Sequence, residues 1–300
     1  MTFGDGRFYL YVASHLDATP ADLNPTVAAR GPALRYGRIG LPALVWVLSA
    51  GRPSVMPYAQ PVAMILSGAA IAGATVLLLD RLPIRVAVIP FLAMGLSLSI
   101  TGGFVEPLAA AACLWAIVLA RRQRWATAAV ALAAAVLTRE SSVVIVAGLA
   151  SWALIRRDRR GAAIVLASLL PVLAWHALVR TRFGIWPALD PYLASGADLN
   201  RVPFKSIVSA LTGGSWTVRF IAGGHLALGL WCATQWRTST LGSSAAAASL
   251  QVAIVPALTW SFVGDTLRTF ALLELMAVLL VASIVNTRRL QASSTQAAAG

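Results

Sequence analysis

Long apolar segments separated by short polar connections make up most of this chain of 300 residues. They lie at about 61–79, 86–100, 104–120, 125–138, 141–155, 161–179, 219–235, 244–263 and 267–286. Several are shorter than the roughly 20 residues that cross a bilayer untilted, so we expect their ends to extend into the connections. The pattern predicts an all-α fold, a polytopic transmembrane helical bundle with about nine spans.

The polar connections alternate between two kinds. One kind is rich in arginine and contains Arg81, Arg85, Arg121, Arg122, Arg124, Arg156, Arg157, Arg159, Arg160 and Arg237, with Arg288 and Arg289 in the tail. The other kind is acidic and contains Glu106, Glu140, Asp190, Asp198 and Asp265, with Asp5, Asp17 and Asp22 before the first segment. An excess of Lys and Arg in short loops marks the cytoplasmic side. We therefore expect a multi-pass plasma-membrane protein whose active face is extracytoplasmic.

This topology divides the chain into three parts. Residues 1–60 form a large first extracytoplasmic loop, in which the short apolar stretch 36–50 predicts an interfacial helix. Residues 61–287 form the transmembrane helical domain, including a long outside loop at 180–218, and 288–300 form an Ala/Ser-rich cytoplasmic tail expected to be disordered. Because no signal peptide or anchor guides the first loop outside, we hypothesise a transmembrane helix encoded upstream of Met1. A stop codon in frame shortly before Met1 would contradict this hypothesis.

Composition narrows the class of protein further. The chain is 58% hydrophobic and 12% charged, which excludes an ordinary soluble domain. Its net charge of +13 lies in short clusters between apolar runs, where topology and anionic headgroups explain it better than nucleic acid does. The two cysteines lie in apolar segments and have no metal-ligand spacing. The three histidines form no sequence cluster, so Ser-His-Asp hydrolysis and zinc chemistry lack support.

Two N-terminal features are candidates for chemistry. Asp5 stands between two glycines, which let the backbone turn tightly and expose the carboxylate. It can act as a general base or, alternatively, as the N-cap of a following helix. Arg35 and Arg38 precede the expected interfacial helix. Their guanidinium groups suit either a phosphate or generic headgroup anchoring.

Further candidates come from the outside connections. Glu106 begins a helix, where the helix dipole alone stabilises a carboxylate. Arg139 and Glu140 form a tight turn, which either holds a local salt bridge or faces the same cavity as Asp5. Asp265 precedes the last helix together with Arg268, as an N-cap or as a functional group. One acid, Glu274, lies inside an apolar helix and indicates a functional role, with Arg268 or an outside-loop arginine as its expected partner.

Taken in order along the chain, these features resemble the GT-C class of integral-membrane glycosyltransferases. The elements that carry the resemblance are Asp5-Gly6 with Tyr9, Arg35-Tyr36-x-Arg38-x-x-x-Pro42, Gly103 to Pro107, Leu137 to Glu140, and Asp265 to Arg268. The resemblance covers about residues 3–290, and each motif is short.

The resemblance implies transfer of a sugar from a polyprenyl-phosphate-linked donor to an extracytoplasmic glycan, lipid or protein acceptor, with inversion. It implies that Asp5 is the base and that Arg35, Arg38 or Arg139 bind phosphate. The substrate-binding residues would be Tyr9, Arg35, Arg38, Glu106, Arg139, Glu140, Asp265 and Arg268. Some members of the class use a divalent metal ion and others do not, and no carboxylate cluster in this sequence decides between them. Membrane lipids are the other expected partners.

Two other classes of protein compete with this interpretation. A transporter or flippase for a lipid-linked or small polar substrate would favour polar residues at the midplane and broken helices. A non-catalytic membrane scaffold or a decayed enzyme would need none of these residues. Substitution of Asp5 and Glu140 separates the classes, because only an enzyme loses turnover while its expression is unchanged.

Overall fold

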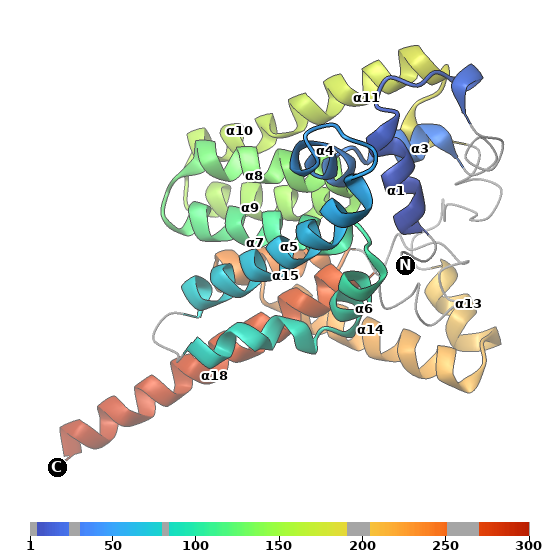
Figure 1. The fold of residues 1–300 in the computed structure, drawn as a ribbon. Coiled ribbons are helices and arrows are strands. Elements are labelled where there is room, and N and C mark those ends of the chain that lie inside the picture. Colours follow the sequence, from blue (N-terminus) through green and yellow to red (C-terminus); the bar gives the residue numbers. More distant parts are fainter. Residues whose placement is uncertain (1–4, 24–30, 80–83, 191–204, 251–269, 300) are drawn as a thin grey trace.

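The computed structural model describes residues 5–23, 31–79, 84–190, 205–250 and 270–299 (Figure 1). All secondary structure in these ranges is helical. The elements are α1 (Asp5–Ser14), η1 (Pro20–Asp22), α3 (Pro32–Gly37), α4 (Gly40–Leu48), α5 (Met56–Leu78), η2 (Ile84–Leu92), α6 (Met94–Gly102), α7 (Glu106–Arg121), α8 (Trp125–Thr138), η3 (Glu140–Ser142), α9 (Val143–Ile155), α10 (Arg159–Ala167), α11 (Leu169–Phe183), η4 (Pro187–Leu189), α13 (Lys205–Gly213), α14 (Trp216–Thr234), α15 (Thr240–Ala248) and α18 (Ala271–Ala299).

Within the described ranges, three helices are long and apolar enough to cross a membrane. They are Met56–Leu78, Arg159–Phe183 and Ala271–Ser294. The elements Arg85–Leu92 and Gly95–Gly102 add a fourth candidate if they form one broken span, since a bend of 91° separates them. The structure therefore agrees with a helical protein that contains membrane-spanning segments. It does not confirm the expected count of about nine.

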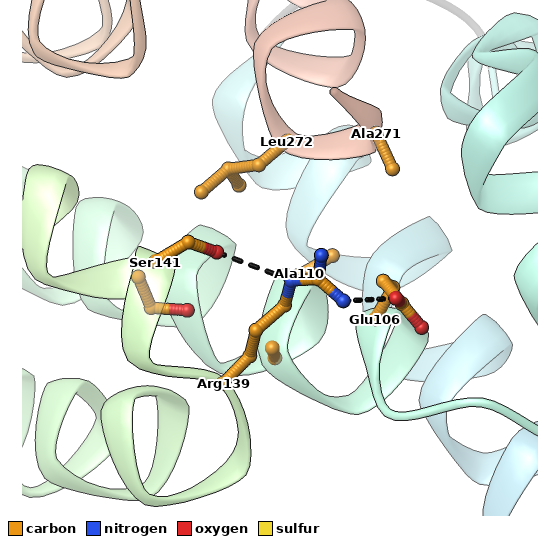
Figure 2. Close-up of a pocket in the computed structure, with 8 residues that line it drawn as sticks. Glu106, Ala110, Arg139, Ser141, Ala271 and Leu272 are labelled. Carbon is orange, nitrogen blue, oxygen red and sulfur yellow. Dashed lines mark hydrogen bonds and ion pairs between the residues drawn. The ribbon is translucent and has the colours of Figure 1, made fainter. Parts of the chain in front are cut away.

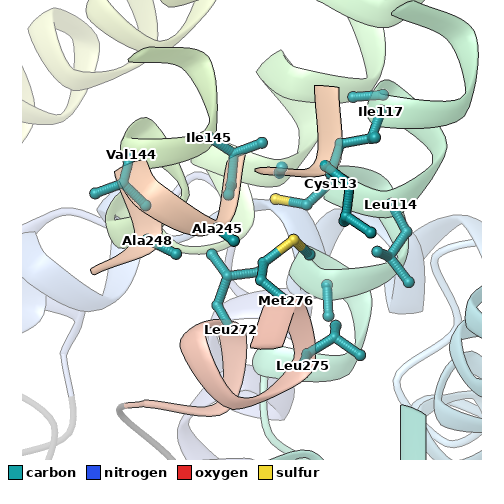
Figure 3. Close-up of a cluster of buried hydrophobic side chains, with 14 of the residues drawn as sticks. Cys113, Leu114, Ile117, Val144, Ile145, Ala245, Ala248, Leu272, Leu275 and Met276 are labelled. Atoms are coloured by element: carbon teal, nitrogen blue, oxygen red, sulfur yellow. The ribbon is translucent and has the colours of Figure 1, made fainter. Parts of the chain in front are cut away.

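The largest hydrophobic core lies where α7, α9, α15 and α18 meet (Figure 3). Its side chains include Cys113, Leu114, Ile117, Val144, Ile145, Ala245, Ala248, Leu272, Leu275 and Met276. Small residues let these helices approach closely. At Gly148 of α9 an added Cβ would lie 2.9 Å from the Ser243 carbonyl oxygen of α15, so only glycine permits this contact. Both cysteines are buried free thiols.

Each candidate span also carries large apolar side chains on its outer surface. The exposed ones are Val62, Ile65 and Leu66 on α5, Leu170 and Leu173 on α11, and Val281 and Val285 on α18. Contiguous apolar surface of this kind is costly in water and favourable against lipid chains. The outer face of the bundle is thus consistent with burial in a bilayer.

Hydrogen bonds hold the N-terminal helices to one another and to α11, which belongs to a candidate span. The Tyr36 hydroxyl donates to the His15 carbonyl at 2.7 Å, and the Trp175 indole of α11 donates to the Tyr36 carbonyl at 2.8 Å. Arg182 of α11 donates to the Leu16 carbonyl at 2.7 Å. Burial is the largest influence on the Tyr36 hydroxyl and raises its pKa. This first region is therefore ordered against the bundle and contributes to the site described below.

Two elements differ from the sequence expectations. The interfacial helix expected at 36–50 is divided between α3 and α4, because Arg38, with a ψ of 59°, leaves the helical conformation between them. The tail 288–300, expected to be disordered, continues α18 as a helix to Ala299. Its Ala and Gln residues have high helix propensity and extend a helix that is already nucleated.

Candidate functional site

Arg38 and Glu140 form a two-point ion pair between the N-terminal region and the turn after α8. The Arg38 Nε donates to both carboxylate oxygens, at 3.1 and 2.8 Å, and its Nη2 donates to Oε1 at 2.6 Å. This fork geometry is the strongest form of the arginine–carboxylate contact. The Arg38 side chain is 18% exposed and the Glu140 side chain 43% exposed, so the pair lies at the edge of the bundle.

The ion pair fixes the charge of both groups. Burial would raise the pKa of Glu140, but the Arg38 charge and its hydrogen bonds outweigh burial and lower that pKa to about 2. Burial also opposes the charge of Arg38, but Glu140 and a hydrogen bond to the Tyr9 side chain raise the pKa of the guanidinium. Tyr9 is only 1% exposed, so α1 holds this hydroxyl rigidly against Arg38. Glu140 is therefore permanently ionised at neutral pH.

A second ion pair lies on the other side of the same turn (Figure 2). Arg139 Nη1 donates to Glu106 Oε1, and its Nε donates to the Ser141 hydroxyl at 3.1 Å. Both side chains are well buried, Arg139 at 15% exposure and Glu106 at 5%. Glu106 is the first residue of α7, where the positive end of the helix dipole stabilises its carboxylate. The adjacent residues Arg139 and Glu140 thus bind partners from two different parts of the chain, Glu106 of α7 and Arg38.

Two features of the backbone help to position the two ion pairs. An added Cβ at Gly40 would lie 2.8 Å from the Thr138 Cα, so α4 approaches the end of α8 only because residue 40 is glycine. This approach places Arg38 beside the turn that carries Glu140. The Gln60 side chain of α5 donates to the Gly103 carbonyl at 2.8 Å. Gly103 has a φ of +66° and ends α6 shortly before Glu106.

The other predicted site residues fall into two groups. Arg35 is buried, with its guanidinium carbon 5.1 Å from the centroid of the Phe8 ring, so it contacts different groups from Arg38. Asp5 is the first residue of α1, one helical turn before Tyr9, and its side chain lies outside the described part. Asp265 and Arg268 also lie outside the described residues.

His176 belongs to this neighbourhood, although sequence reasoning did not select it. Its ring hydrogen-bonds to the Gly37 backbone, next to Arg38, and interacts electrostatically with Glu140. The available signal was a lone ionisable side chain in the apolar segment 161–179. Such residues indicate a functional hypothesis by default.

Of two cavities in the bundle, the small one is lined by residues of an ion pair and the large one is not. The cavity beside Arg139 and Glu106, closed by Ala271 and Leu272 of α18, holds about 10 Å³, room for one water molecule (Figure 2). A groove between α1, α5 and the end of α6 holds about 560 Å³. It is lined by Arg7, Leu10, Pro57, Gln60, Met64 and Ile100, among others. Gly103, three residues before Glu106, belongs to its wall.

Among the described residues, no group of three or more His, Cys, Asp or Glu side chains could hold a metal ion. Comparison of the chain with family models, with curated proteins and with solved structures gives no match. The described residues provide two guanidinium groups held by carboxylates, and a separate amphipathic groove whose wall includes Gly103, three residues before Glu106.

Proposed function

We propose that this chain is a GT-C-type membrane glycosyltransferase. It would cross the plasma membrane about nine times and act at the extracytoplasmic face. Its donor would be a polyprenyl-phosphate-linked sugar, and its acceptor a glycan, lipid or protein on that face. The product would carry the inverted anomeric configuration.

One observation carries the proposal: charged residues from distant parts of the sequence converge on one turn. Arg38 and Glu140 are 102 residues apart, and Glu106 and Arg139 are 33 apart. All four belong to motifs that carry the resemblance to the GT-C class. Their convergence at one end of α8 is what a phosphate-handling site in that class requires.

The chemistry assigns a different role to each group. The acceptor hydroxyl attacks the anomeric carbon, the bond from that carbon to the phosphate oxygen breaks, and the hydroxyl proton passes to the base. Asp5 is the proposed base, by resemblance. Arg38 would stabilise the negative charge that develops on the departing polyprenyl phosphate, and Arg139 is a further candidate for this role by resemblance alone. Glu140 is a poor base with its pKa at about 2, so its role is to hold Arg38 in place.

The groove at α1, α5 and α6 supplies a route for the lipid part of the donor. Its walls are mainly apolar, with Arg7 of α1 at one side. Ile65, which also lines it, is 70% exposed on the outer face of α5. A prenyl chain entering from the bilayer would lie against these side chains, with its phosphate toward Arg7. Tyr9, Arg35, Glu106, Asp265 and Arg268 complete the proposed substrate-binding set.

The test measures release of free polyprenyl phosphate from a panel of polyprenyl-phosphate sugars in membrane vesicles that contain the chain and a broad acceptor mixture. We expect release by the wild type and a loss of about 100-fold or more in Asp5→Asn, the usual range for a general base. The matched control is Asp17→Asn, an exposed acid in the same N-terminal region, which should retain activity. A wild type that is present in the membrane but releases nothing would contradict the proposal.

A second candidate function has one observation in its favour. The bend of 91° at the candidate broken span, with polar contacts at its break, is the feature expected of a transporter or flippase. In the same vesicles, such a protein would move a lipid-linked sugar between leaflets without releasing polyprenyl phosphate. Measuring both quantities distinguishes the two functions.

A further inference from the structure

A basic groove lies at the start of α8, at the opposite end of this helix from the turn that carries Arg139 and Glu140. Helices α8 and α10 pack against each other, so the connection that leads into α8 lies near the one that leads into α10 (Figure 1). The groove between the two connections holds about 480 Å³. Sites for small molecules typically hold about 300–1,000 Å³. The two connections contain seven arginines: Arg121, Arg122, Arg124, Arg156, Arg157, Arg159 and Arg160.

The two connections have the same backbone geometry. Gln123 in the first and Arg157 in the second have a φ of +60°. The next residue, Arg124 or Asp158, donates its backbone N–H at 2.9 Å to the carbonyl five residues earlier. This arrangement ends one helix and lets the chain turn sharply into the next. It places both Arg124 and Asp158 in the wall of the groove.

The Trp125 ring fixes the wall between the two connections. It lines the groove and is only 8% exposed. An added Cβ at Gly161 would lie 2.6 Å from the indole Cε2, so the start of α10 meets this ring only because residue 161 is glycine. The Gly161 N–H donates to Asp158 Oδ1 at 2.7 Å. Asp158 therefore already serves as the N-cap of α10.

Two of the seven arginines offer their charge to the groove. Arg121 donates to a carbonyl of α5, and Arg156 lies over a ring of α9. Arg124 and Arg160 instead line the groove, and neither guanidinium group forms a hydrogen bond or an ion pair within the described part of the chain. Asp158 is the one carboxylate in the same wall, so the wall keeps a net positive charge.

An apolar strip continues from the groove along the outer surface of α8. Thr127 lines the groove, and Val130 and Ala134 follow it at spacings of three and four residues, so the three share one face of the helix. All three are exposed, Val130 at 71%. The strip is about 10 Å long, against about 15 Å for half of a bilayer's hydrocarbon core. On α10, Ile164 adds an apolar side chain to the groove itself.

We infer that this groove binds an anionic phospholipid. The phosphate would accept hydrogen bonds from Arg124 and Arg160, and an acyl chain would lie against Val130 and Ala134. Basic pockets between membrane helices on the arginine-rich side bind anionic headgroups in this way. A free phosphate ion would share the contacts with the cations but would leave the apolar strip uncovered, which favours the lipid. The inference is independent of the proposed transferase activity, since the groove and the charged turn lie at opposite ends of α8.

The test measures lipid binding to the full chain in a neutral detergent by native mass spectrometry. Phosphatidylglycerol is the anionic probe and phosphatidylcholine the zwitterionic one. We expect one phosphatidylglycerol to bind about tenfold more tightly than phosphatidylcholine, or better, the equivalent of one charge-assisted hydrogen bond. Equal affinity for the two lipids would overturn the inference.

Glycerol 3-phosphate distinguishes a lipid from a free phosphate, because it offers a phosphate without acyl chains. At a concentration equal to that of the lipid, it should leave phosphatidylglycerol bound. Displacement of the lipid under these conditions would assign the groove to free phosphate and overturn the inference.

Two double variants that remove the same charge assign the binding to the groove. Arg124→Gln/Arg160→Gln removes both cations of its wall, and the Kd for phosphatidylglycerol should rise about tenfold or more. Arg122→Gln/Arg159→Gln is the matched control from the same connections, outside the wall, and should change the Kd by less than about twofold. Equal losses in both variants would show that the charge acts diffusely and would overturn the inference.

The substitutions should leave the fold intact, because all four arginine side chains are exposed. Unfolding temperatures of both double variants in the same detergent should match that of the wild type. If a variant fails to fold, the comparison of the two lipids on the wild type still decides the outcome.

Discussion

Arg38 approaches Glu140 with two of its nitrogens at 2.8 Å or closer, although the residues are 102 positions apart. The contact joins the first ordered region of the chain to the turn between α8 and α9. Because Arg139 in the same turn holds Glu106, one turn gathers α7, α8 and the N-terminal region. Substitutions at this turn should therefore affect activity and folding in separable ways.

The two-point geometry of the Arg38 guanidinium is expected to contribute to turnover in addition to its charge. Arg38→Lys keeps a cation but cannot bind a carboxylate or phosphate at two points. We expect transferase turnover in the vesicle assay to fall about tenfold or more, since tenfold corresponds to about 1.4 kcal/mol, close to the value of one charge-assisted hydrogen bond. The exposed Arg52→Lys is the control and should leave turnover unchanged. Equal turnover in both variants would contradict the assigned role.

Acid should destabilise the folded protein by protonating Glu140. Its pKa is lowered from 4.5 to about 2 in the folded chain, so the stabilisation is complete above about pH 4.5 and is lost as the pH falls toward 2. Unfolding temperatures measured in detergent from pH 6 to pH 2.5 should fall more steeply for the wild type than for Glu140→Gln. The difference should be modest because solvent reaches 43% of the Glu140 side chain. Parallel curves would exclude this group as a source of acid sensitivity.

Stability should depend more on the buried ion pair of Glu106 and Arg139 than on the more exposed ion pair of Arg38 and Glu140. Glu106→Gln leaves a guanidinium that is only 15% exposed without its counter-charge, which typically costs about 3 kcal/mol or more. The double variant Glu106→Gln/Arg139→Gln should recover part of that loss. Thermal unfolding of the wild type, the single variants Glu106→Gln and Arg139→Gln, and the double variant forms a complete double-mutant cycle. Additive losses would indicate that the two side chains do not interact.

Gly40 should be intolerant of a side chain. Alanine there would bring Cβ to within 2.8 Å of the Thr138 Cα, so α4 must move away from α8 and take Arg38 with it. We expect a loss of about 1–3 kcal/mol in unfolding free energy, the usual cost of overpacking. Gly224→Ala in α14 is the matched control, since nothing lies within 4 Å of its added Cβ and alanine favours helix by about 1 kcal/mol.

The groove should control donor affinity. Arg7→Gln removes the cation at the groove, and we expect the KM for the polyprenyl-phosphate sugar to rise about tenfold, the equivalent of one charge-assisted hydrogen bond. The kcat should change little, because a contact that Arg7 makes equally with the phosphate of the bound donor and of the transition state affects only the KM. Steady-state kinetics in vesicles, with Arg52→Gln as the control, separate the two constants. A fall in kcat at unchanged KM would contradict a role in binding.

The helical class followed from the apolar segments, because most of the described residues in each segment are helical. The number of spans did not follow, since hydropathy alone does not distinguish a short buried helix such as α8 from a short span. The break between η2 and α6 was also not predicted. Proline at position 90 gave a local signal for it, but a bend of 91° depends on the helices packed around it.

The structure brings together four of the residues selected from the sequence, but their pairing was not predicted. Arg38, Arg139, Glu106 and Glu140 were all selected, but a local contact between Arg139 and Glu140 was one expected arrangement. Each instead pairs across elements, because the close approach at Gly40 brings Arg38 to the turn. Such an approach depends on tertiary packing. His176 was missed for the same reason, since α11 reaches Gly37 only in three dimensions.

The carboxylates already bound to Arg38 and Arg139 affect how strongly any other anion can bind there. A phosphate that bound Arg38 through the same fork of Nε and Nη2 would take the place of Glu140, so its entry would be an exchange of one anion for another. The energy of the lost ion pair is subtracted from that of the new contact, which keeps the net affinity moderate. When the phosphate departs, Glu140 returns to a cation that is already in position. Such an exchange would never leave the guanidinium as an isolated positive charge.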